Sequence, residues 1–415
     1  MAARLALLEN FVENDCIPAE PVFALEMDEI ESRTGSRWKE IPPVLTSLKS
    51  KARSLGLWNL FMPKGHPGSA NVPMKEYAQM SEVMGRSFIA PEACNCSAPD
   101  TGNMEVFANY GSPAQQARWL KPLLEGTIRS AFLMTEPAVA SSDATNIACG
   151  VSRENGMYVI NGRKWWSSGA MDPRCKVAIV MCRHEGAEWD AKGTHGRHSM
   201  VVVPMDTPGV RPIRALKVFG YDDAPHGHAE VDLKDVRVPL SSILLGEGRG
   251  FEIAQGRLGP GRVHHCMRAV GMAERALAAF VKRSRERVAF GKALSEDSVV
   301  RYQVAECRME IAQSRLLVQD CATKLEAKGL KGAIQEVSMI KVVVPNMACR
   351  VIDRAIQVHG GMGVCQDTFL AEAYAHMRTL RIADGPDEVH VRSVAKYEYR
   401  RTDGRGGGIR ITSRL

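Results

Sequence analysis

The sequence contains no long apolar run, and no stretch approaches the roughly 20 residues that a helix needs to span a bilayer. Its 11 cysteines form no CxxC pair and show no histidine-linked spacing, so we expect no structural metal. No basic block is interleaved with aromatics, which make up only 6% of the chain, so we expect no nucleic-acid partner. The cysteines are interpreted as reduced thiols in an intracellular compartment.

What the chain does have is length and apolar content. With 415 residues, of which 45% are hydrophobic, it can bury a large core in two or three domains. The net charge of +7 is spread along the chain. It is compatible with an anionic ligand but does not identify one.

The hydrophobic pattern changes twice along the chain. Helical spacing occupies 1–130, and short β-rich runs bounded by turn residues dominate 131–244, including 177–182, 199–203 and 228–233. Long helical segments return over 245–402, notably 262–289, 296–328 and 333–359. The segment 403–415 is glycine-rich and is predicted to be a flexible tail. This order predicts an α+β fold with a helical domain on each side of a β domain.

Asp384 lies in a segment where a turn meets a helix. Gly360–Gly363 precedes it and is typical of a tight turn that lets the backbone approach a ligand. Pro386 follows it and predicts a helix from about that residue to about Arg401. From this segment alone, Asp384 is either an acid that stabilises the free N–H groups of the helix or a catalytic base.

Four motifs occur in a fixed order. Met134–Asp143 reads MTEPAVASSD, Tyr158–Gly169 reads YVINGRKWWSSG, Arg287–Gly291 reads RVAFG and Gln357–Gly363 reads QVHGGMG. Together they resemble the signatures of the acyl-CoA dehydrogenase family of flavoproteins over almost the whole chain. The amino-acid sequences of the first two motifs are most similar to those of the branch that contains family members 10 and 11 of animals.

The resemblance implies a fold, a cofactor and a reaction. The fold is an N-terminal helical domain, a middle β-sheet domain and a C-terminal four-helix bundle that hold FAD between them. The reaction is α,β-dehydrogenation of a fatty acyl-CoA to the trans-2-enoyl-CoA. It needs a carboxylate that removes the proton beside the thioester carbonyl, and a flavin that accepts a hydride at N5 from the next carbon.

Asp384 aligns with the glutamate that serves as base in most of the family, and it is shorter by one methylene group. Some relatives place the base instead one residue before an arginine on an earlier helix. That position is Gly261 in this chain, ahead of Arg262, and glycine cannot act as a base. The resemblance therefore favours Asp384 as the base over its helix-stabilising alternative.

The remaining site residues are implied by motif. Two of these residues have an alternative role without a ligand: Trp166 can be a core aromatic, and Arg287 can belong to a solvated face. Ser141 and Ser142 are uncertain in their division of roles, because this loop is one residue longer than the common form. The expected FAD contacts are Phe132, Met134, Thr135, Ser141, Trp166, Ser168, Arg287, Phe290, Gln357, Gly361, Pro386 and Glu388, and the expected substrate contacts are Ser142, Arg262 and Gly385.

Arg287, Phe290, Gln357 and Gly361 are expected to serve the FAD of a neighbouring subunit, which predicts a homodimer or homotetramer. The electron acceptor is expected to be electron-transfer flavoprotein or oxygen. Two other functions stay open, an acyl-CoA oxidase and a catalytically silent protein that binds flavin and acyl-CoA. The acyl chain is not predicted, and the resemblance leaves open a 4-hydroxy or phosphorylated chain.

The last three residues, Ser413-Arg414-Leu415, are a near variant of the peroxisomal S-K-L signal. Acidic residues at Glu9 and Glu13 disfavour a mitochondrial transit peptide. A peroxisomal location is therefore expected, with a cytoplasmic or mitochondrial one as the alternative.

Overall fold

The computed structural model describes residues 2–402. Within them the chain divides into two compact units. The first, here called the sheet unit, comprises 2–80 and 87–261, and the second, the helical unit, comprises 81–86 and 262–402.

The N-terminal segment is helical, and its helices follow local signals. α2 ends at Gly35, whose φ of 74° lies in the left-handed region that favours glycine, and α3 has a proline in its first turn. The helices are α1 (Ala2–Phe11), α2 (Ile17–Thr34), α3 (Pro43–Ser54), α4 (Met74–Met84), α5 (Ala90–Ala93), α6 (Asp100–Tyr110), α7 (Pro113–Gln115) and α8 (Lys121–Leu124).

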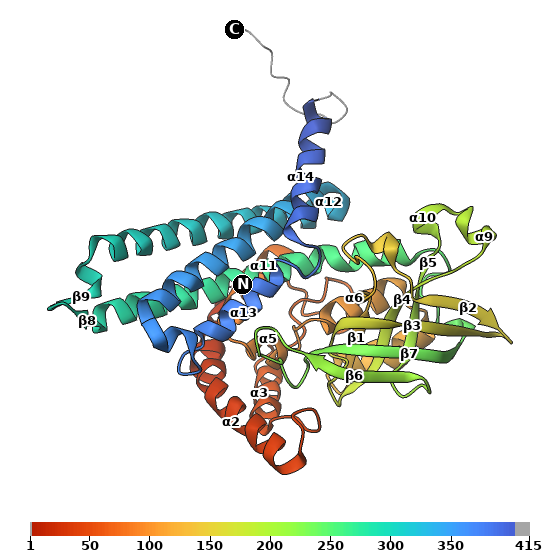
Figure 1. The fold of residues 1–415 in the computed structure, drawn as a ribbon, viewed down its shortest axis with the longest axis horizontal. Coiled ribbons are helices and arrows are strands. Elements are labelled where there is room, and N and C mark those ends of the chain that lie inside the picture. The colour runs from red at the N-terminus through yellow and green to blue at the C-terminus, as the bar shows by residue number, and fades with distance from the viewer. Residues whose placement is uncertain (1, 403–415) are drawn as a thin grey trace, which may run out of the picture. The chain divides into compact units, whose positions relative to one another are not determined.

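The middle segment forms a seven-stranded sheet within the described residues (Figure 1). The strands are β1 (Arg129–Leu133), β2 (Gly150–Glu154), β3 (Met157–Ser168), β4 (Cys175–Arg183), β5 (His198–Pro204), β6 (Val210–Leu216) and β7 (His228–Pro239), with short helices α9 (Ala187–Asp190) and α10 (Gly193–Gly196) before β5. The order is β1-β4-β2-β3-β7-β6, and β5 pairs with β4. β4 is buried from Val177 to Cys182, as expected for a strand covered on both faces.

A β-bulge interrupts the antiparallel pairing of β3 with β7. The register shifts between Lys164 and Ser167, and Trp166 has a φ of 50°. Bulges redirect side chains locally, and here the redirected residues belong to the second sequence motif. Beyond the bulge, Ser168 pairs directly with His228.

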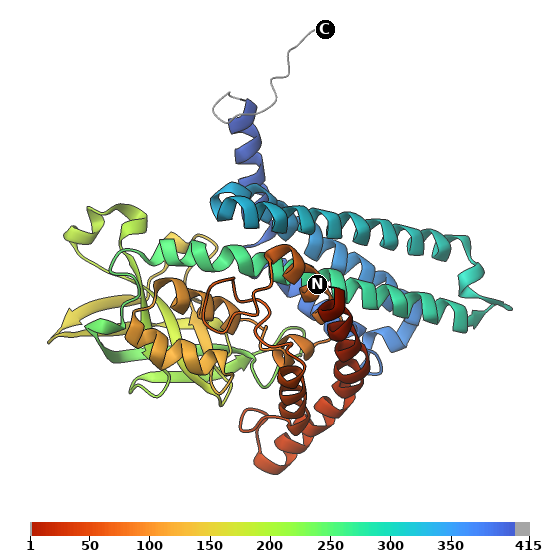
Figure 2. The same cartoon turned by 180° about the vertical axis from the view of Figure 1, so that it is seen from behind.

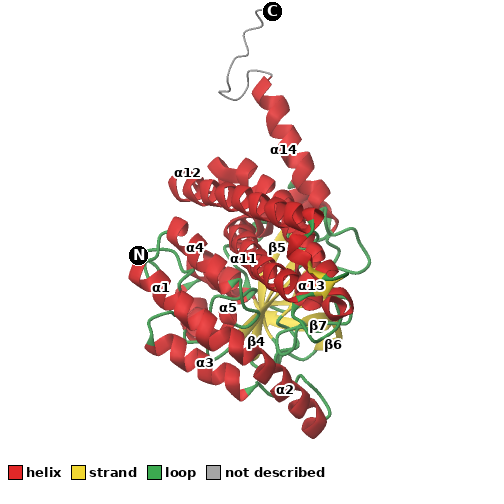
Figure 3. Cartoon of the chain, turned by 90° about the vertical axis from the view of Figure 1, so that its left-hand side faces the viewer, coloured by secondary structure: helices red, strands yellow, loops and turns green. Residues whose placement is uncertain are grey.

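The C-terminal segment is a set of long helices, of which α11 and α12 run side by side in two opposite views (Figures 1 and 2). Figure 3 views these helices nearly along their axes. Asp297 caps α12 by accepting hydrogen bonds from the backbone N–H groups of Val299 and Val300. The elements are α11 (Gly250–Glu286), β8 (Val288–Ala289), β9 (Lys292–Ala293), α12 (Ser298–His359), α13 (Leu370–Leu380) and α14 (Asp387–Thr402).

The α+β fold class is confirmed, with differences in helix bounds. α11 starts at Gly250, earlier than expected, and the two helices expected over 296–328 and 333–359 are continuous in α12, broken at Gly329 with φ of 64°. Glycine tolerates that conformation, so the break falls close to the expected gap. α14 begins one residue after Pro386, as the sequence predicted to within one residue.

None of the described helices is both long and apolar enough to cross a membrane. Between residues 2 and 402, no group of three His, Cys, Asp or Glu side chains is arranged to hold a metal ion. The expected targeting tripeptide lies outside the described residues.

Candidate functional site

The end of β1 carries the first group of expected FAD contacts. Phe132 lies in β1, Met134 and Thr135 follow it, and all three are half-buried. The backbone N–H of Trp165 donates to the Thr135 carbonyl oxygen at 3.0 Å, so the structure brings the first two motifs together. The guanidinium of Arg257 lies 3.8 Å from the centroid of the Phe132 ring, a cation–π contact that the sequence did not reveal.

A buried ion pair fixes the loop after β1. Lys164, which has no exposed surface, donates to the carboxylate of Glu136 at 2.8 Å and to the carbonyl oxygens of Met134 and Met181 at 3.0 and 2.7 Å. The Glu136 carboxylate also accepts the backbone N–H of Cys149 at 2.9 Å. All of these groups are satisfied, so the pair holds the Met134 carbonyl in one place.

The two serines of the first motif differ in their surroundings. The Ser141 hydroxyl accepts the Glu136 backbone N–H at 2.9 Å and closes the loop on itself. Ser142 is exposed. The contacts of Ser141 are therefore internal to the loop, and the ligand roles expected for both serines stay predictions.

Trp166 and Ser168 lie at the end of β3. Trp166 is 38% exposed, which argues against the core alternative for this residue. The Ser168 hydroxyl lies 2.8 Å from Nδ1 of His228, and the indole ring of Trp166 has its centroid 5.5 Å from the His228 ring. An exposed indole beside a half-buried hydroxyl suits a flat polar ligand such as a flavin.

The helical unit brings together the third and fourth motifs, although they are far apart in sequence. Arg287 is half-buried and donates from Nη1 to the Val358 carbonyl oxygen at 2.9 Å, which argues against the solvated-face alternative. Gln357 and Gly361 are exposed beside this contact. Phe290 has a φ of 53° and a fully exposed ring, which no described residue covers. The ring is thus free to meet a ligand or a second subunit.

Asp384 lies on the turn between α13 and α14. Its φ of 57° is left-handed, and Gly385 follows with φ of 104°. A Cβ atom at Gly385 would also lie 2.9 Å from Nε2 of His390, so both the backbone conformation and the available space favour glycine. The Asp384 side chain is 23% exposed, and Pro386 is half-buried while Glu388 is exposed in the first turn of α14.

Three side chains hold the carbonyl oxygens of this turn. Arg262 donates from Nε to the Asp384 carbonyl oxygen at 3.1 Å, and Nε2 of His390 lies 3.2 Å from the same oxygen. Lys341, which is buried, donates to the carbonyl oxygens of Ala383, at 2.7 Å, and Leu380. The left-handed conformation is therefore fixed by its surroundings, as is common where backbone strain serves a site.

The charges around the turn favour an ionised carboxylate. Burial lowers the pKa of both Arg262 and Lys341, and Asp384 opposes this effect in each case. The attraction is mutual, so these cations stabilise the charged form of Asp384. Burial also lowers the pKa of His390 to about 4, so this ring is neutral at pH 7 and donates from Nε2 to the Asp384 carbonyl. Nε2 of His265 lies 3.7 Å from the Asp384 carboxylate.

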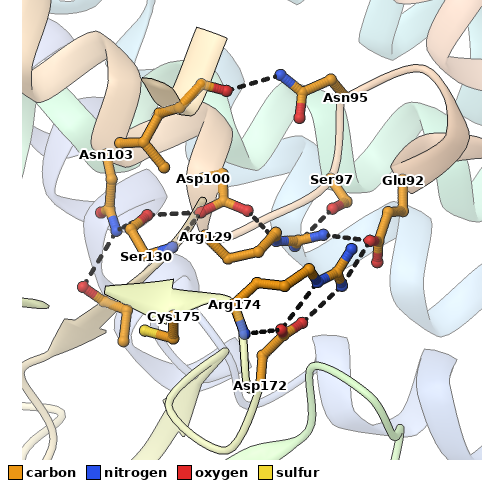
Figure 4. Close-up of polar contacts among 12 residues, drawn as sticks. Glu92, Asn95, Ser97, Asp100, Asn103, Arg129, Ser130, Asp172, Arg174 and Cys175 are labelled. Carbon is orange, nitrogen blue, oxygen red and sulfur yellow. Dashed lines mark hydrogen bonds and ion pairs between the residues drawn. The ribbon is translucent and has the colours of Figure 1, made fainter. Parts of the chain in front are cut away.

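A second cluster of charges, which no sequence motif indicated, lies at the other end of β1 (Figure 4). Arg129 is 2% exposed and pairs with Glu92 at 2.7 Å and with Asp100. Arg174 pairs with the same Glu92 at 2.8 Å and with Asp172 at 2.7 Å. The cluster ties α5 and α6 to the first residue of β1, whose last residues lead into the expected flavin contacts.

The ionisation of this cluster is set by burial and pairing together. Burial opposes the charge on Glu92, but Arg129 and Arg174 hold its pKa below the usual range. Burial raises the pKa of Asp100, and Arg129 opposes that rise. Burial also lowers the pKa of Lys49, 3.8 Å from Glu92, to about 8.

Comparison with known proteins identifies the family. Three family models match the chain: the acyl-CoA dehydrogenase N-terminal domain over 9–127, the middle domain over 131–236 and the C-terminal domain over 248–398. The chain belongs to the acyl-CoA dehydrogenase family. Membership confirms the expected enzyme class and cofactor, an FAD-dependent oxidoreductase.

Individual relatives support the expected branch. The chain is 53% identical over 395 residues to chicken acyl-CoA dehydrogenase family member 11. The matched region covers 95% of this chain and 50% of the chicken protein. It is 54% identical to the probable acyl-CoA dehydrogenase FadE2 of Mycobacterium tuberculosis, with 92% of both chains covered. A putative acyl-CoA dehydrogenase structure from Mycobacterium abscessus matches with a TM-score of 0.91 at 49% identity, covering 96% of this chain and 97% of that one. This chain therefore spans about half the length of the chicken protein.

Several residues around the acyl-CoA dehydrogenase motifs could not be found from the motifs alone. Lys341, His265 and Arg257 each sit in helical sequence with no local pattern that distinguishes them from ordinary helix residues. Lys164 and Glu136 do lie inside motifs, next to residues that are expected to contact FAD. That position in the sequence was the one indication that they matter. Their buried pairing became clear only from the fold.

Proposed function

We propose that this chain catalyses the FAD-dependent α,β-dehydrogenation of a fatty acyl-CoA to the trans-2-enoyl-CoA, as in fatty acid β-oxidation. The observation that carries the proposal is the Asp384 turn. A partly exposed carboxylate is presented on a left-handed backbone whose carbonyl oxygens are held by Arg262, His390 and Lys341. Such preorganisation is what a general base needs.

Asp384 is proposed to remove the proton from the carbon beside the thioester carbonyl. Arg262 and Lys341 each stabilise the negative charge of this carboxylate. Arg268 donates to Nδ1 of His265 at 3.3 Å, which places the proton of the neutral ring on Nε2, the atom that faces Asp384. His265 is therefore proposed to orient the carboxylate.

The residues of the sheet unit fit a flavin. Trp166 offers an exposed aromatic face, Ser168 a hydroxyl beside it, and Thr135 a loop joined by hydrogen bond to the same bulge. When bound, the flavin supplies the acceptor for the hydride that leaves the β-carbon. The chain's own contribution there is to hold and orient the ring through these residues.

The site is proposed to be shared between subunits of a homodimer or homotetramer. Phe290 is fully exposed next to the half-buried Arg287, and Val299, Tyr302 and Met309 are exposed at more than half of their surface along α12. Exposed apolar side chains in such number are typical of an interface. Native mass spectrometry with FAD present tests the assembly, and a monomer that retains FAD would contradict it.

The experiment that tests the proposed function is anaerobic titration of the purified yellow protein with acyl-CoA thioesters of different chain length, with and without a 4-substituent. Bleaching of the flavin with formation of the trans-2-enoyl-CoA is expected. Bleaching that is reversed by oxygen at catalytic rate would indicate an oxidase, and electron-transfer flavoprotein is the proposed acceptor otherwise. Bound FAD with no bleaching by any thioester would indicate the catalytically silent protein.

We further propose a peroxisomal location from Ser413-Arg414-Leu415. A fluorescent fusion that displays this C-terminus is expected to enter peroxisomes, and deletion of Leu415 is expected to abolish entry. Equal distribution of the two fusions would contradict the proposal.

A further inference from the structure

A chain of three polar side chains lies behind Ser168. Ser168 and His228 are direct cross-strand partners on β3 and β7, and the serine hydroxyl lies 2.8 Å from Nδ1 of the ring. The other ring nitrogen, Nε2, lies 3.0 Å from the carboxylate of Asp223. His228 and Asp223 are 17% and 8% exposed at their side chains. Partial burial of this chain strengthens its hydrogen bonds relative to water.

The proton on His228 decides which way the Ser168 hydroxyl points. The Asp223 carboxylate can only accept, so Nε2 carries a proton in either charge state. If the ring is neutral, Nδ1 is an acceptor, the serine donates its hydrogen to it, and only oxygen lone pairs remain for a ligand. If the ring is charged, Nδ1 donates to the serine oxygen, and the hydroxyl hydrogen is free to point toward a ligand.

The charged groups around His228 are few and come from two directions. Asp223, in the loop before β7, faces Nε2, and the ring of His226 lies 6.2 Å from that of His228. Burial lowers the pKa of His226 to about 4, so His226 is neutral at pH 7 and leaves the carboxylate as the nearest charge. Arg129 and Glu92 of the buried cluster act on the pKa of His226 in opposite directions. Trp166 covers His228 as an aromatic neighbour without titrating.

We propose that His228, held by Asp223, is a positioning residue that sets whether the Ser168 hydroxyl donates or accepts a hydrogen bond toward the flavin. The proposal rests on the proposed function, and it takes the hydroxyl of Ser168, an expected FAD contact, to face flavin N5. The oxidised flavin has an unprotonated N5 that accepts a hydrogen bond, whereas the reduced flavin has an N5–H that donates one. A charged His228 suits the first state and a neutral His228 suits the second.

A measurable consequence is proton release linked to flavin reduction. The two electrons and the hydrogen at N5 come from the reductant, and the proton that leaves Nδ1 of His228 passes to solvent. Net proton uptake on reduction is therefore smaller by up to one proton than it would be without the histidine. For a two-electron couple, one proton corresponds to a tenfold change in the equilibrium constant per pH unit, or about 30 mV per pH unit.

The test compares the midpoint potential of FAD-loaded wild type with that of His228→Asn from pH 5.5 to 8.5. Asparagine carries no exchangeable ring proton, so the potential of the variant is expected to fall more steeply with pH, by up to about 30 mV per unit, over part of this range. Asp223→Asn is expected to reduce the difference from His228→Asn at the upper end of the range, because the carboxylate that favours the charged ring is removed.

The chain offers a matched control. His184 and Ser199 form another buried histidine–serine pair of the same sheet, with 2.7 Å between Nε2 and Oγ. His184→Asn is expected to leave the pH dependence of the potential unchanged. In a Ser168→Ala background, His228→Asn is expected to have no further effect, because the hydroxyl that transmits its charge state is absent.

The outcomes separate the inference from the proposed function. Equal slopes for wild type and His228→Asn, in proteins that bind FAD and bleach with acyl-CoA, would overturn the role of His228 alone. A slope change that persists in the Ser168→Ala background would also overturn it, since His228 would then act without the serine. Absence of FAD from the folded wild type would overturn both proposals.

Discussion

The charged cluster around Arg129 and the one around Asp384 are built on opposite plans. In the sheet unit, Arg129 and Arg174 meet Glu92, Asp100 and Asp172, so nearly every buried charge has an opposite charge within hydrogen-bonding distance. In the helical unit, the cations Arg262 and Lys341 donate to backbone carbonyl oxygens. The carboxylate of Asp384 remains partly exposed.

The difference indicates which cluster supports the fold and which supports chemistry. In the first cluster, buried charges pair with one another and mainly fix the elements that they join. In the second, the cations bind carbonyl oxygens of a turn and stabilise a nearby carboxylate that stays partly exposed and available.

Arg129→Met should destabilise the fold and spare the chemistry. Removing one partner of a buried ion pair typically costs about 3–5 kcal/mol of unfolding free energy, because Glu92 and Asp100 would be left without their main counter-charge. Chemical denaturation measures the loss. The fraction that stays folded should still be bleached by acyl-CoA.

Arg163→Met is the matched control for that variant. Arg163 pairs with Glu230 at 2.6 Å on the same sheet, but its side chain is 54% exposed. Glu230 is buried but keeps Arg214 at 2.7 Å, and a pair with an exposed arginine contributes about 0–1 kcal/mol, so little change is expected. Equal losses from the two variants would show that the buried cluster has no special role in stability.

Glu105→Gln should change how stability depends on pH. Burial raises the pKa of Glu105 to about 8, opposed by Arg257, and no described residue gives its Oε1 a hydrogen bond. Between about pH 5 and 8 the unfolded chain loses this proton while the folded protein keeps it, so wild-type stability should fall as pH rises, by up to a few kcal/mol. Glutamine does not titrate, so the variant should show a flatter profile by thermal unfolding.

A wild-type profile as flat as that of Glu105→Gln would contradict this assignment. It would mean that Glu105 is ionised in the folded protein, because its attraction to Arg257 outweighs the effect of burial. The sheet unit would then contain no neutral buried acid at this position.

Arg287→Ala should weaken FAD retention without unfolding the helical unit. Loss of a hydrogen bond from a charged group to the cofactor costs roughly 1.5–3 kcal/mol, or about 10- to 150-fold in affinity. Fluorescence titration of the apoprotein with FAD measures it. Arg285→Ala, at an exposed position in the last turn of α11, two residues before Arg287, should leave the affinity unchanged, and equal losses would assign the effect to general charge instead.

The fold was predictable from sequence wherever the signal was local. The start of α14 followed from Pro386, because proline suits the first turn of a helix and keeps the residue before it out of the helical conformation. The strands 177–182, 199–203 and 228–233 lie inside β4, β5 and β7, because β-rich runs ended by turn residues report their own conformation.

What could not be predicted depends on pairing between distant residues. Glu92, Arg129 and Arg174 are separated by tens of positions, and nothing next to any of them marks it as buried. His228 belongs to a strand that the sequence predicted, but its partnership with Ser168 needs the register of β3 on β7. Buried pairing is a property of the tertiary fold, which the hydrophobic pattern does not encode.

The most direct test of the account is single-turnover flavin reduction by acyl-CoA in Asp384→Asn. Asparagine keeps the size of the side chain and the backbone contacts of the turn but removes the base, so reduction should slow at least about a hundredfold while FAD content and melting temperature stay near wild type. Asp384→Glu, with the longer acid of most relatives, should retain some activity. Near-normal reduction in Asp384→Asn, together with a loss of about 1 kcal/mol in stability, would instead make this residue a helix-stabilising acid and leave the proposed reaction without its base.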